Sequence, residues 1–347
     1  MYIAIDGGGT KTEYLLLDKH FQVVDHYLGG CLNHDLLGNG WADVSLALKA
    51  SIDVLLERNG LTVSDIEAVA AGISGLDTAG DQQQADACFS SAGISRFLAI
   101  NDGYLPIAAE NPAAWGVSLN CGTGMCCAAI DPSGNRIKLA GMDEWSGDAG
   151  GGNWIVMQMY RKVYENLILK DVSTPFVMEY MKVMNLGGKV DFINSWSDLK
   201  DGENTECKVL HRKIIQLFFE LLERSNPEVQ AFADQMIKCA AYTIDAAVRE
   251  LHFFGEKIPV YLSGSILTKA ASAGYLSMLK EALSCICQGK LEVHMCTKRP
   301  VEGAVQLLKG YKKNNNIIIP TYLSISQNVL LLGERKEQNR IVKNSAE

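Results

Sequence analysis

The chain of 347 residues lacks several features that mark particular classes of protein. Its 10 cysteines are about 3% of the residues, far below the density of a disulfide-stapled scaffold. No stretch approaches the run of about 18 apolar residues that a membrane-spanning helix needs. Acidic side chains outnumber basic ones by 40 to 32, so neither a nucleic acid nor an anionic membrane is expected as a partner.

Metal-binding and secretory signals are also missing. Cys126 is adjacent to Cys127, and one residue separates Cys285 from Cys287, so neither pair has the spacing of a zinc site. The 6 histidines are scattered, and the first residues have neither a basic start nor a long apolar segment. We therefore expect reduced thiols and a cytoplasmic protein.

The chain instead contains a pattern of strands and helices that occurs twice. In the first half the residue pattern predicts strands at Tyr2–Ile5, Tyr14–Leu17, Gln22–Tyr27, Ile66–Ile73 and Phe97–Ile100, with helices at Trp41–Arg58 and Gln82–Ser91. In the second half it predicts strands at Gly116–Asn120, Met125–Ile130, Arg136–Leu139, Val260–Ser263 and Leu291–Met295, a helix-rich stretch from Asn153 to Leu251 and a helix at Val301–Tyr311. Three strands followed by alternating helices and strands are typical of a mixed α/β fold.

The repeated pattern predicts a duplicated fold of two domains with a cleft between them, as the length also suggests. The expected division is 1–112, completed by a helix at about 300–312, and 113–299, which carries a helical insertion. Residues 313–347 are expected to form a tail with a short strand at Ile317–Ile319 and a polar end from Glu334.

A glycine-rich turn, Asp6–Thr12, joins the first two expected strands. Glycines allow positive φ and a close approach of backbone amides to a ligand, and Thr10 and Thr12 add hydroxyl donors. The turn therefore predicts a phosphate site, in which the Asp6 carboxylate would act through Mg²⁺ and its waters. The alternative is a plain hairpin turn; the P-loop pattern is absent.

Asn101-Asp102-Gly103 directly follows an expected buried strand. A carboxylate at the carboxyl end of such a strand lies where open α/β sheets bind ligands. Asp102 is therefore a candidate functional acid, although an acid in this place could instead be only a helix N-cap.

Two further segments have ligand-binding character. The segment Gly141–Trp154 combines acids, glycines and two tryptophans, which suit the polar edge and apolar faces of a sugar ring. Its alternative role is a glycine-rich loop that caps a helix starting at Asn153. The small-residue turn Leu262–Ser265 would let a flat group lie against the backbone, although many strand–helix turns look the same.

Together these segments resemble the superfamily of sugar kinases, actin and heat-shock ATPases, and more closely the N-acetylglucosamine kinases and BadF/BadG/BcrA/BcrD-type ATPases. The resemblance runs from Tyr2 to about Tyr311. Its most specific parts are the Asp6–Thr12 turn, Gly147-Asp148-x-Gly150-x-x-x-Trp154-Ile155, Pro300-Val301-x-Gly303-Ala304-Val305, and Asn33-His34 followed by Leu37-Gly38.

The resemblance implies two ribonuclease H-like domains that bind ATP and Mg²⁺ and transfer a phosphoryl group to a sugar hydroxyl. Asp102 matches the general base, and Asp6 would order Mg²⁺ through water. The implied ATP and phosphate ligands are Gly8, Gly9, Thr10, Lys11, Thr12, Gly122, Thr123, Gly124, Gly264 and Ser265. The implied sugar ligands are Asn33, His34, Asp102, Trp145 and Asp148, and a homodimer is expected.

Departures from the family pattern leave the substrate open. Asp143 and Glu144 are extra acids before the Gly147 motif, and Cys121 stands where relatives carry serine or threonine. N-acetylglucosamine is the first expectation, with glucosamine or N-acetylmuramic acid as alternatives. An activator ATPase of a 2-hydroxyacyl-CoA dehydratase system and a non-catalytic sugar sensor remain as alternative functions.

Overall fold

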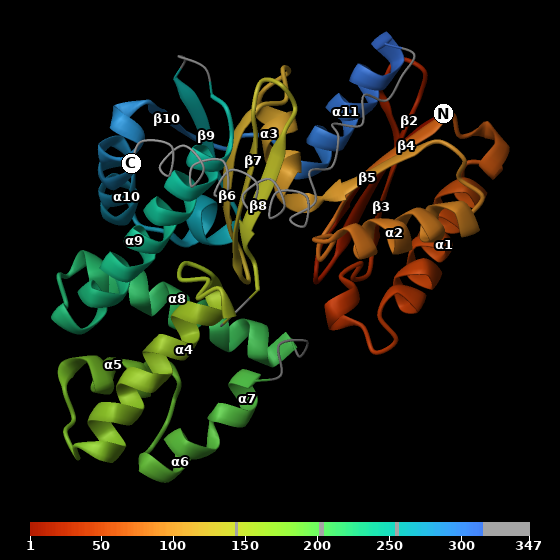
Figure 1. Ribbon diagram of the computed structural model, residues 1–347. Coiled ribbons are helices and arrows are strands. Elements are labelled where there is room, and N and C mark those ends of the chain that lie inside the picture. The colour runs from red at the N-terminus through yellow and green to blue at the C-terminus, as the bar shows by residue number, and fades with distance from the viewer. Residues whose placement is uncertain (143–144, 201–204, 254–256, 315–347) are drawn as a thin grey trace, which may run out of the picture. The chain divides into compact units, whose positions relative to one another are not determined.

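The computed structural model describes residues 1–142, 145–200, 205–253 and 257–314 (Figure 1). The chain folds into two five-stranded sheets with helices around them, which confirms the predicted α/β class. The expected strand at Ile317–Ile319, the polar end from Glu334 and the acids Asp143 and Glu144 lie outside the described residues.

The first sheet has the order β3-β2-β1-β4-β5. Its strands are β1 (Tyr2–Gly7), β2 (Thr12–Leu17), β3 (Val23–Gly29), β4 (Ala68–Ile73) and β5 (Phe97–Asn101). Strand β1 pairs antiparallel with β2 and parallel with β4, and β4 pairs parallel with β5. The central strands β1 and β4 are almost entirely buried because both faces are covered.

The second sheet repeats this arrangement, with the order β10-β9-β6-β7-β8. Its strands are β6 (Gly116–Cys121), β7 (Met125–Ile130), β8 (Arg136–Ala140), β9 (Ile258–Ser263) and β10 (Leu291–Met295). Strands β1 and β6 also share one burial pattern, in which four buried residues precede a half-buried Asp6 or Asn120. The predicted duplication is therefore confirmed in both strand order and burial.

Helices occupy the connections between the strands and the predicted insertion. They are α1 (Trp41–Arg58), α2 (Ala79–Ser91), α3 (Leu105–Glu110), α4 (Gly152–Val163), α5 (Pro175–Val183), α6 (Lys189–Asn194), α7 (Trp196–Lys200), α8 (Thr205–Glu223), α9 (Pro227–Glu250), α10 (Ala273–Cys285) and α11 (Pro300–Asn314). Helix α11 packs on α3, β1 and β4. A Cβ atom at Gly303 would lie 2.1 Å from the carbonyl oxygen of Leu105, so only glycine permits this contact. None of the helices within the described ranges has the length and apolarity needed to cross a membrane.

Short helical turns complete the fold. The 3-10 turns are η1 (His34–Leu36), η2 (Val63–Asp65), η3 (Asp102–Tyr104) and η7 (Cys287–Gly289), and the π-helical turns are η5 (Tyr164–Leu169) and η6 (Ile266–Ala270).

Helix α2 begins three residues before the predicted start at Gln82. Thr78 is its N-cap: the Thr78 hydroxyl accepts from the Asp81 amide at 3.1 Å, and the Asp81 carboxylate accepts from the Thr78 amide at 2.8 Å. This capping box stabilises a first turn that has little apolar periodicity. The prediction was wrong here because it relied on the apolar residues.

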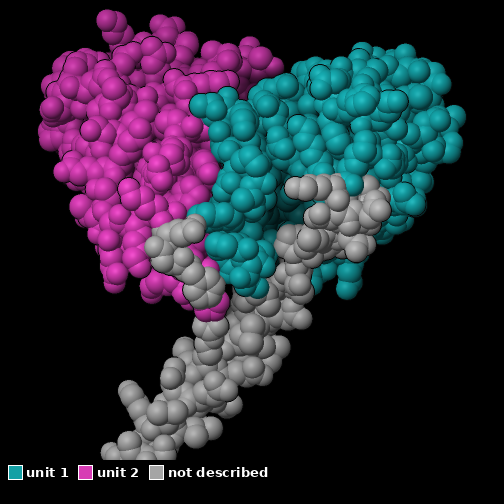
Figure 2. All heavy atoms as spheres, turned by 90° about the horizontal axis from the view of Figure 1, so that it is seen from above, with its two compact units in different colours: residues 1–116, 129–138, 297–347 teal, residues 117–128, 139–296 magenta. Residues whose placement is uncertain are grey.

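The chain divides into two compact units, which Figure 2 draws in two colours. The first comprises Met1–Gly116, Ala129–Lys138 and the described chain from Thr297 onward. The second comprises Val117–Ala128 and Leu139–Cys296, and it includes the long helical insertion.

Candidate functional site

The carboxyl edge of the first sheet collects most of the predicted polar residues of the first unit. Asp6 lies at the carboxyl end of β1, Ser74 follows β4, and Asp102 follows β5. These three strands are parallel neighbours, so their carboxyl ends lie at one edge. The sequence-predicted acids Asp6 and Asp102 are therefore brought to the same end of one sheet.

The Gly7–Gly9 run makes a tight hairpin between β1 and β2. The Gly8 amide donates to the Lys11 carbonyl at 3.1 Å. The positive φ that glycine allows is not used here, because none of the three glycines adopts it. The glycines are instead explained by the lack of space for a side chain. A Cβ atom at Gly8 would lie 3.0 Å from the Lys11 carbonyl oxygen, and one at Gly9 would lie 2.9 Å from the Leu36 side chain.

The side chains of this turn divide into two groups. Thr12 is fully buried, and its hydroxyl donates to the Gly30 carbonyl at 2.6 Å, so it fixes the start of β2. Thr10 and Lys11 are exposed to solvent at the tip of the turn. A phosphate at this turn would therefore meet Thr10, Lys11 and the glycine backbone before the Thr12 hydroxyl.

Asp6 and Asp102 both have perturbed acidities. Burial raises the pKa of Asp6 to about 7, the charges of Asp102 and Glu13 add to the rise, and Lys11 opposes it. Burial also raises the pKa of Asp102 to about 6, with Lys138 lowering it and Asp77 raising it. Two carboxylates that are costly to ionise at one sheet edge are typical of a site for a cation or for proton transfer.

Asp102 is not the N-cap of the turn that it begins. The cap is Asn101, whose Oδ1 accepts from the Gly103 amide at 2.9 Å. The alternative prediction that Asp102 is only the helix N-cap is therefore wrong.

Two residues near Asp102 were missed by the sequence analysis. Asp77 accepts hydrogen bonds from Asn101 Nδ2 and from Lys138 Nζ, each at 2.7 Å. Asp77 lies four residues after the end of β4, and Lys138 lies on β8. Position after a buried strand could have drawn attention to Asp77, but nothing in the sequence pairs it with Lys138.

Asn33 and His34 are held against the loop that follows β4. Asn33 Nδ2 donates to Ser74 Oγ at 3.1 Å, and its Oδ1 accepts from the Asp35 amide at 2.9 Å. His34 Nε2 lies 2.9 Å from the Gly75 carbonyl oxygen, and its ring stacks on Trp41 with centroids 4.6 Å apart. Both predicted sugar ligands thus lie next to the carboxyl end of β4.

In the second unit, the Gly122–Gly124 turn is joined to the start of α4. The Gly152 and Asn153 amides donate to the carbonyls of Gly122 and Thr123 at 2.8 and 3.0 Å. A Cβ atom at Gly151 would lie 2.6 Å from the Gly124 backbone, so glycine is required for this contact. The glycine-rich loop therefore has the alternative role, at the start of a helix that begins at Gly152 rather than at Asn153, and it also fixes the second turn.

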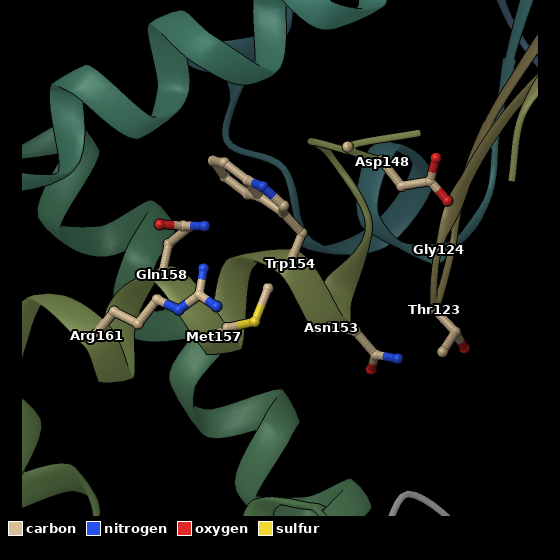
Figure 3. A pocket seen from close by; sticks show the side chains of 9 residues that line it. Thr123, Gly124, Asp148, Asn153, Trp154, Met157, Gln158 and Arg161 are labelled. Carbon is tan, nitrogen blue, oxygen red and sulfur yellow. The ribbon is translucent and has the colours of Figure 1, made fainter. Parts of the chain in front are cut away.

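A pocket of about 450 Å³ lies beside this junction (Figure 3). It is lined by Thr123, Gly124, Gly147, Asp148, Asn153, Trp154, Met157, Gln158 and Arg161. The buried Asp148 carboxylate accepts from the Gly141 amide at 3.0 Å and from the Ser146 hydroxyl, which orients it. Trp154 contributes the aromatic wall, whereas Trp145 is 95% exposed and lies outside the lining.

Gly264 makes a close contact with the carboxyl end of β6. It adopts φ +87°, and a Cβ atom there would lie 2.2 Å from the Cys121 carbonyl oxygen. Ser265, which follows it, is exposed. The Cys121 thiol is buried, and burial raises its pKa, so it is not poised as a thiolate. None of the ten cysteines, all of which lie within the described residues, forms a disulfide.

No group of three or more His, Cys, Asp or Glu side chains suited to a metal occurs among the residues that the structure describes. The residues at the first sheet edge nevertheless fit Mg²⁺. This ion is usually held by one or two carboxylates, waters and substrate phosphates. The raised pKa of Asp6 is the electrostatic cost that a nearby cation would relieve.

Comparisons with known proteins agree with this architecture. The chain is 22% identical over 205 residues to the N-acetyl-D-glucosamine kinase of Dictyostelium discoideum. That alignment covers 57% of this chain and 64% of the relative, so it spans less than two thirds of the relative's length.

Solved structures share the fold. A candidate N-acetylglucosamine kinase from Chromobacterium violaceum has a TM-score of 0.62 at 22% identity, covering 88% of this chain and 98% of its own. A ROK family glucokinase from Streptomyces griseus, solved with glucose and AMPPNP, has a TM-score of 0.53 at 13% identity, covering 88% and 97%. The sequence profile of the BadF/BadG/BcrA/BcrD ATPase family matches residues 3–305, and the chain belongs to this family.

Proposed function

We propose that this protein is a sugar kinase that transfers the γ-phosphoryl group of ATP to a hydroxyl of an amino sugar. N-acetylglucosamine, giving its 6-phosphate, is the first candidate, since a relative with this named activity is similar in sequence and a protein named for it is similar in fold. The observation that carries the proposal is the pair of perturbed acids, Asp6 and Asp102, at the carboxyl edge of the first sheet.

The proposal assigns the predicted binding residues either to ATP or to the sugar. ATP phosphates would bind the glycine turns at Gly8–Lys11 and Gly122–Gly124, and the adenosine would border Gly264 and Ser265. The sugar would bind Asn33, His34 and Asp148, and the apolar face of its ring would suit Trp154 in the pocket. Trp145 remains a further candidate contact.

Asp102 would act as the general base. Its carboxylate would orient the attacking hydroxyl and accept its proton as the new phosphorus–oxygen bond forms and the bond from the γ-phosphorus to the departing ADP breaks. Because burial raises the pKa of Asp102 to about 6, this group is a stronger base than an exposed aspartate and is still ionised at neutral pH. When bound near Asp6, Mg²⁺ would supply neutralisation of phosphate charge.

Three further properties of the protein and a division into lobes complete the proposal. We propose use of Mg²⁺, a homodimer and a cytoplasmic location. We also place the boundary of the duplication near residue 112, so that 1–112 with the helix at 300–312 forms one lobe and 113–299 forms the other. The repeated sheet order and the packing of α11 on β1 and β4 support this division.

The test is release of ADP, coupled to a spectrophotometric readout, with N-acetylglucosamine, glucosamine, N-acetylmuramic acid and glucose. We expect ADP release that depends on an amino sugar and on Mg²⁺. Sugar binding without ADP release from any of the four would favour a sensor. Sugar-independent ATP hydrolysis, with iron retained after anaerobic purification, would favour an activator ATPase.

A further inference from the structure

A chain of three polar side chains lies behind Asp102 in the first unit. Asn101 is only 1% exposed, and both ends of its side-chain amide are used. Its Oδ1 accepts from the Gly103 amide at 2.9 Å, while its Nδ2 donates to Asp77 Oδ1 at 2.7 Å. The same Asp77 oxygen accepts from Lys138 Nζ at 2.7 Å.

The orientation of the Asn101 amide follows from the chemistry of its partners. An ionised carboxylate accepts hydrogen bonds and cannot donate them, whereas a backbone amide only donates. Asn101 must therefore present its NH₂ group to Asp77 and its oxygen to Gly103. A flipped amide would lose both bonds and place two oxygens against each other. Asp77 thus fixes the cap of the turn that carries Asp102.

Lys138 is the counter-ion of the Asp77 carboxylate, which accepts from Asn101. The Lys138 and Asp77 side chains are only 13% and 28% exposed, so this ion pair is largely removed from water. Removing the Lys138 charge would leave the partly buried Asp77 carboxylate without its counter-ion, which is costly and would weaken its hold on the Asn101 amide.

We infer that Asn101, Asp77 and Lys138 are positioning residues that hold Asp102 in the orientation needed to accept a proton from the acceptor hydroxyl. The inference rests on the proposed kinase function for the role of Asp102. A general base must lie within hydrogen-bond reach of its proton, and a small misplacement costs about 10²-fold in rate. Hydrogen bonds link the three side chains to one another and, through Asn101, to the Gly103 backbone, and the charges of Lys138 and Asp77 also act on the Asp102 carboxyl group.

Two substitutions test the inference by removing charge with little change of shape. In Asp77→Asn and Lys138→Met, we expect kcat to fall by about 10-fold to 10²-fold because Asp102 is less well oriented. KM for ATP and for the sugar should change by less than about 3-fold, since the binding residues are retained. The double variant should lose no more than the worse single variant, because both act through one amide. Lys138→Arg should recover most of the kcat lost in Lys138→Met.

A matched control is available on α1 of the same unit. Asp53 pairs with Lys49 at 2.6 Å, and both side chains are well exposed. Asp53→Asn makes the same chemical change as Asp77→Asn and should leave kcat within about 2-fold, since surface ion pairs contribute little. An equal loss of kcat in Asp53→Asn would assign the effect to net charge and overturn the inference.

A second readout does not depend on kinase activity. The side-chain NH₂ resonance of Asn101, assigned by its absence from Asn101→Ala, should exchange slowly in the wild type and at least about 10-fold faster in Asp77→Asn. A protected amide in a wild type that phosphorylates no sugar would sink the proposed function and leave the positioning of the Asp102 turn supported. Unchanged kcat in a folded Asp77→Asn, or an amide that exchanges equally fast in both proteins, would overturn the inference. If Asp77→Asn fails to fold, Lys138→Met serves for the same measurements.

Discussion

The two sheets have the same strand order but differ in charge at their carboxyl edges. The first sheet carries Asp6 at the end of β1 and Asp102 after β5. The corresponding positions of the second sheet are Asn120 at the end of β6 and Cys296 after β10. At these two matched positions the duplication preserves the scaffold but not the carboxylates, while the buried Asp148 lies in the pocket beside the Gly122–Gly124 turn of the second unit. We therefore expect the first edge to supply the general base and the Mg²⁺ contact of the proposed reaction.

The largest expected effect comes from removing the acid at the first edge. Asp102→Asn should lower kcat by about 10²–10⁴-fold, the usual contribution of a positioned general base. ATP affinity, measured by calorimetry, should stay near the wild-type value because the glycine turns are intact. The matched change at the second edge, Cys296→Ser, should leave kcat nearly unchanged. Near-normal turnover in Asp102→Asn would remove the assigned base.

Two glycines at the second edge allow a structural role in packing to be distinguished from a role in contacting a ligand. Gly264→Ala should destabilise the protein by more than about 2 kcal/mol, because it combines φ +87° with a contact of 2.2 Å to the Cys121 oxygen. Gly122→Ala should change stability by less than about 0.5 kcal/mol, since no atom lies within 4 Å of the added Cβ. Its KM for ATP should nevertheless rise if a phosphate approaches this turn. Urea unfolding and steady-state kinetics measure the two effects, and equal stability losses would contradict the packing assignment.

Asp6→Asn tests how much the ionisation of the buried Asp6 carboxyl group destabilises the folded protein. The folded pKa of Asp6 is raised to about 7 from 3.8, so the folded protein holds this proton more tightly than the unfolded chain. Stability is therefore lost as pH rises from about 4 to 7, and the amide should restore on the order of 1–3 kcal/mol at pH 8. Urea unfolding of the wild type and of Asp6→Asn, without Mg²⁺ at pH 5 and pH 8, measures this difference in the free energy of unfolding. A variant that is less stable than the wild type at pH 8 would contradict the prediction.

The smallest expected effect is a shift of the pH profile. Because Asp102 must be ionised to accept a proton, kcat/KM should fall as pH drops below about 6. Burial is the main cause of the raised pKa of Asp102, Lys138 lowers it, and Asp77 raises it. Lys138→Met should therefore move the acidic limb to higher pH, and Asp77→Asn should move it lower. If the acidic limbs of the two variants shifted in the same direction, this assignment of the charge effects on Asp102 would be contradicted.

The fold and the first edge could be predicted because strong local patterns encode them. Buried strands such as Ala68–Ile73 are short apolar runs, and the Asp6–Thr12 turn interrupts two of them with three glycines. The start of α2 was missed because Thr78 and Asp81 act through hydrogen bonds that an apolar pattern does not register.

The features that could not be predicted from the sequence depend on tertiary contacts. Lys138 and Asp77 are 61 residues apart in the chain, so no local signal links them. The geometry of Gly7–Gly9 depends on the side chain of Leu36 and on neighbouring backbone, which sequence spacing cannot place. The pocket beside α4 likewise combines the turn at Thr123 with side chains along one face of the helix.

The most direct test of phosphoryl transfer to a sugar with Asp102 as the base is to compare the amounts of sugar phosphate and ADP that are formed. Mass spectrometry would quantify sugar phosphate against ADP for the wild type and for Asp102→Asn, with N-acetylglucosamine, ATP and Mg²⁺. The account predicts one sugar phosphate for each ADP in the wild type and almost none of either with the variant. ADP without sugar phosphate, or equal yields from the two proteins, would contradict it.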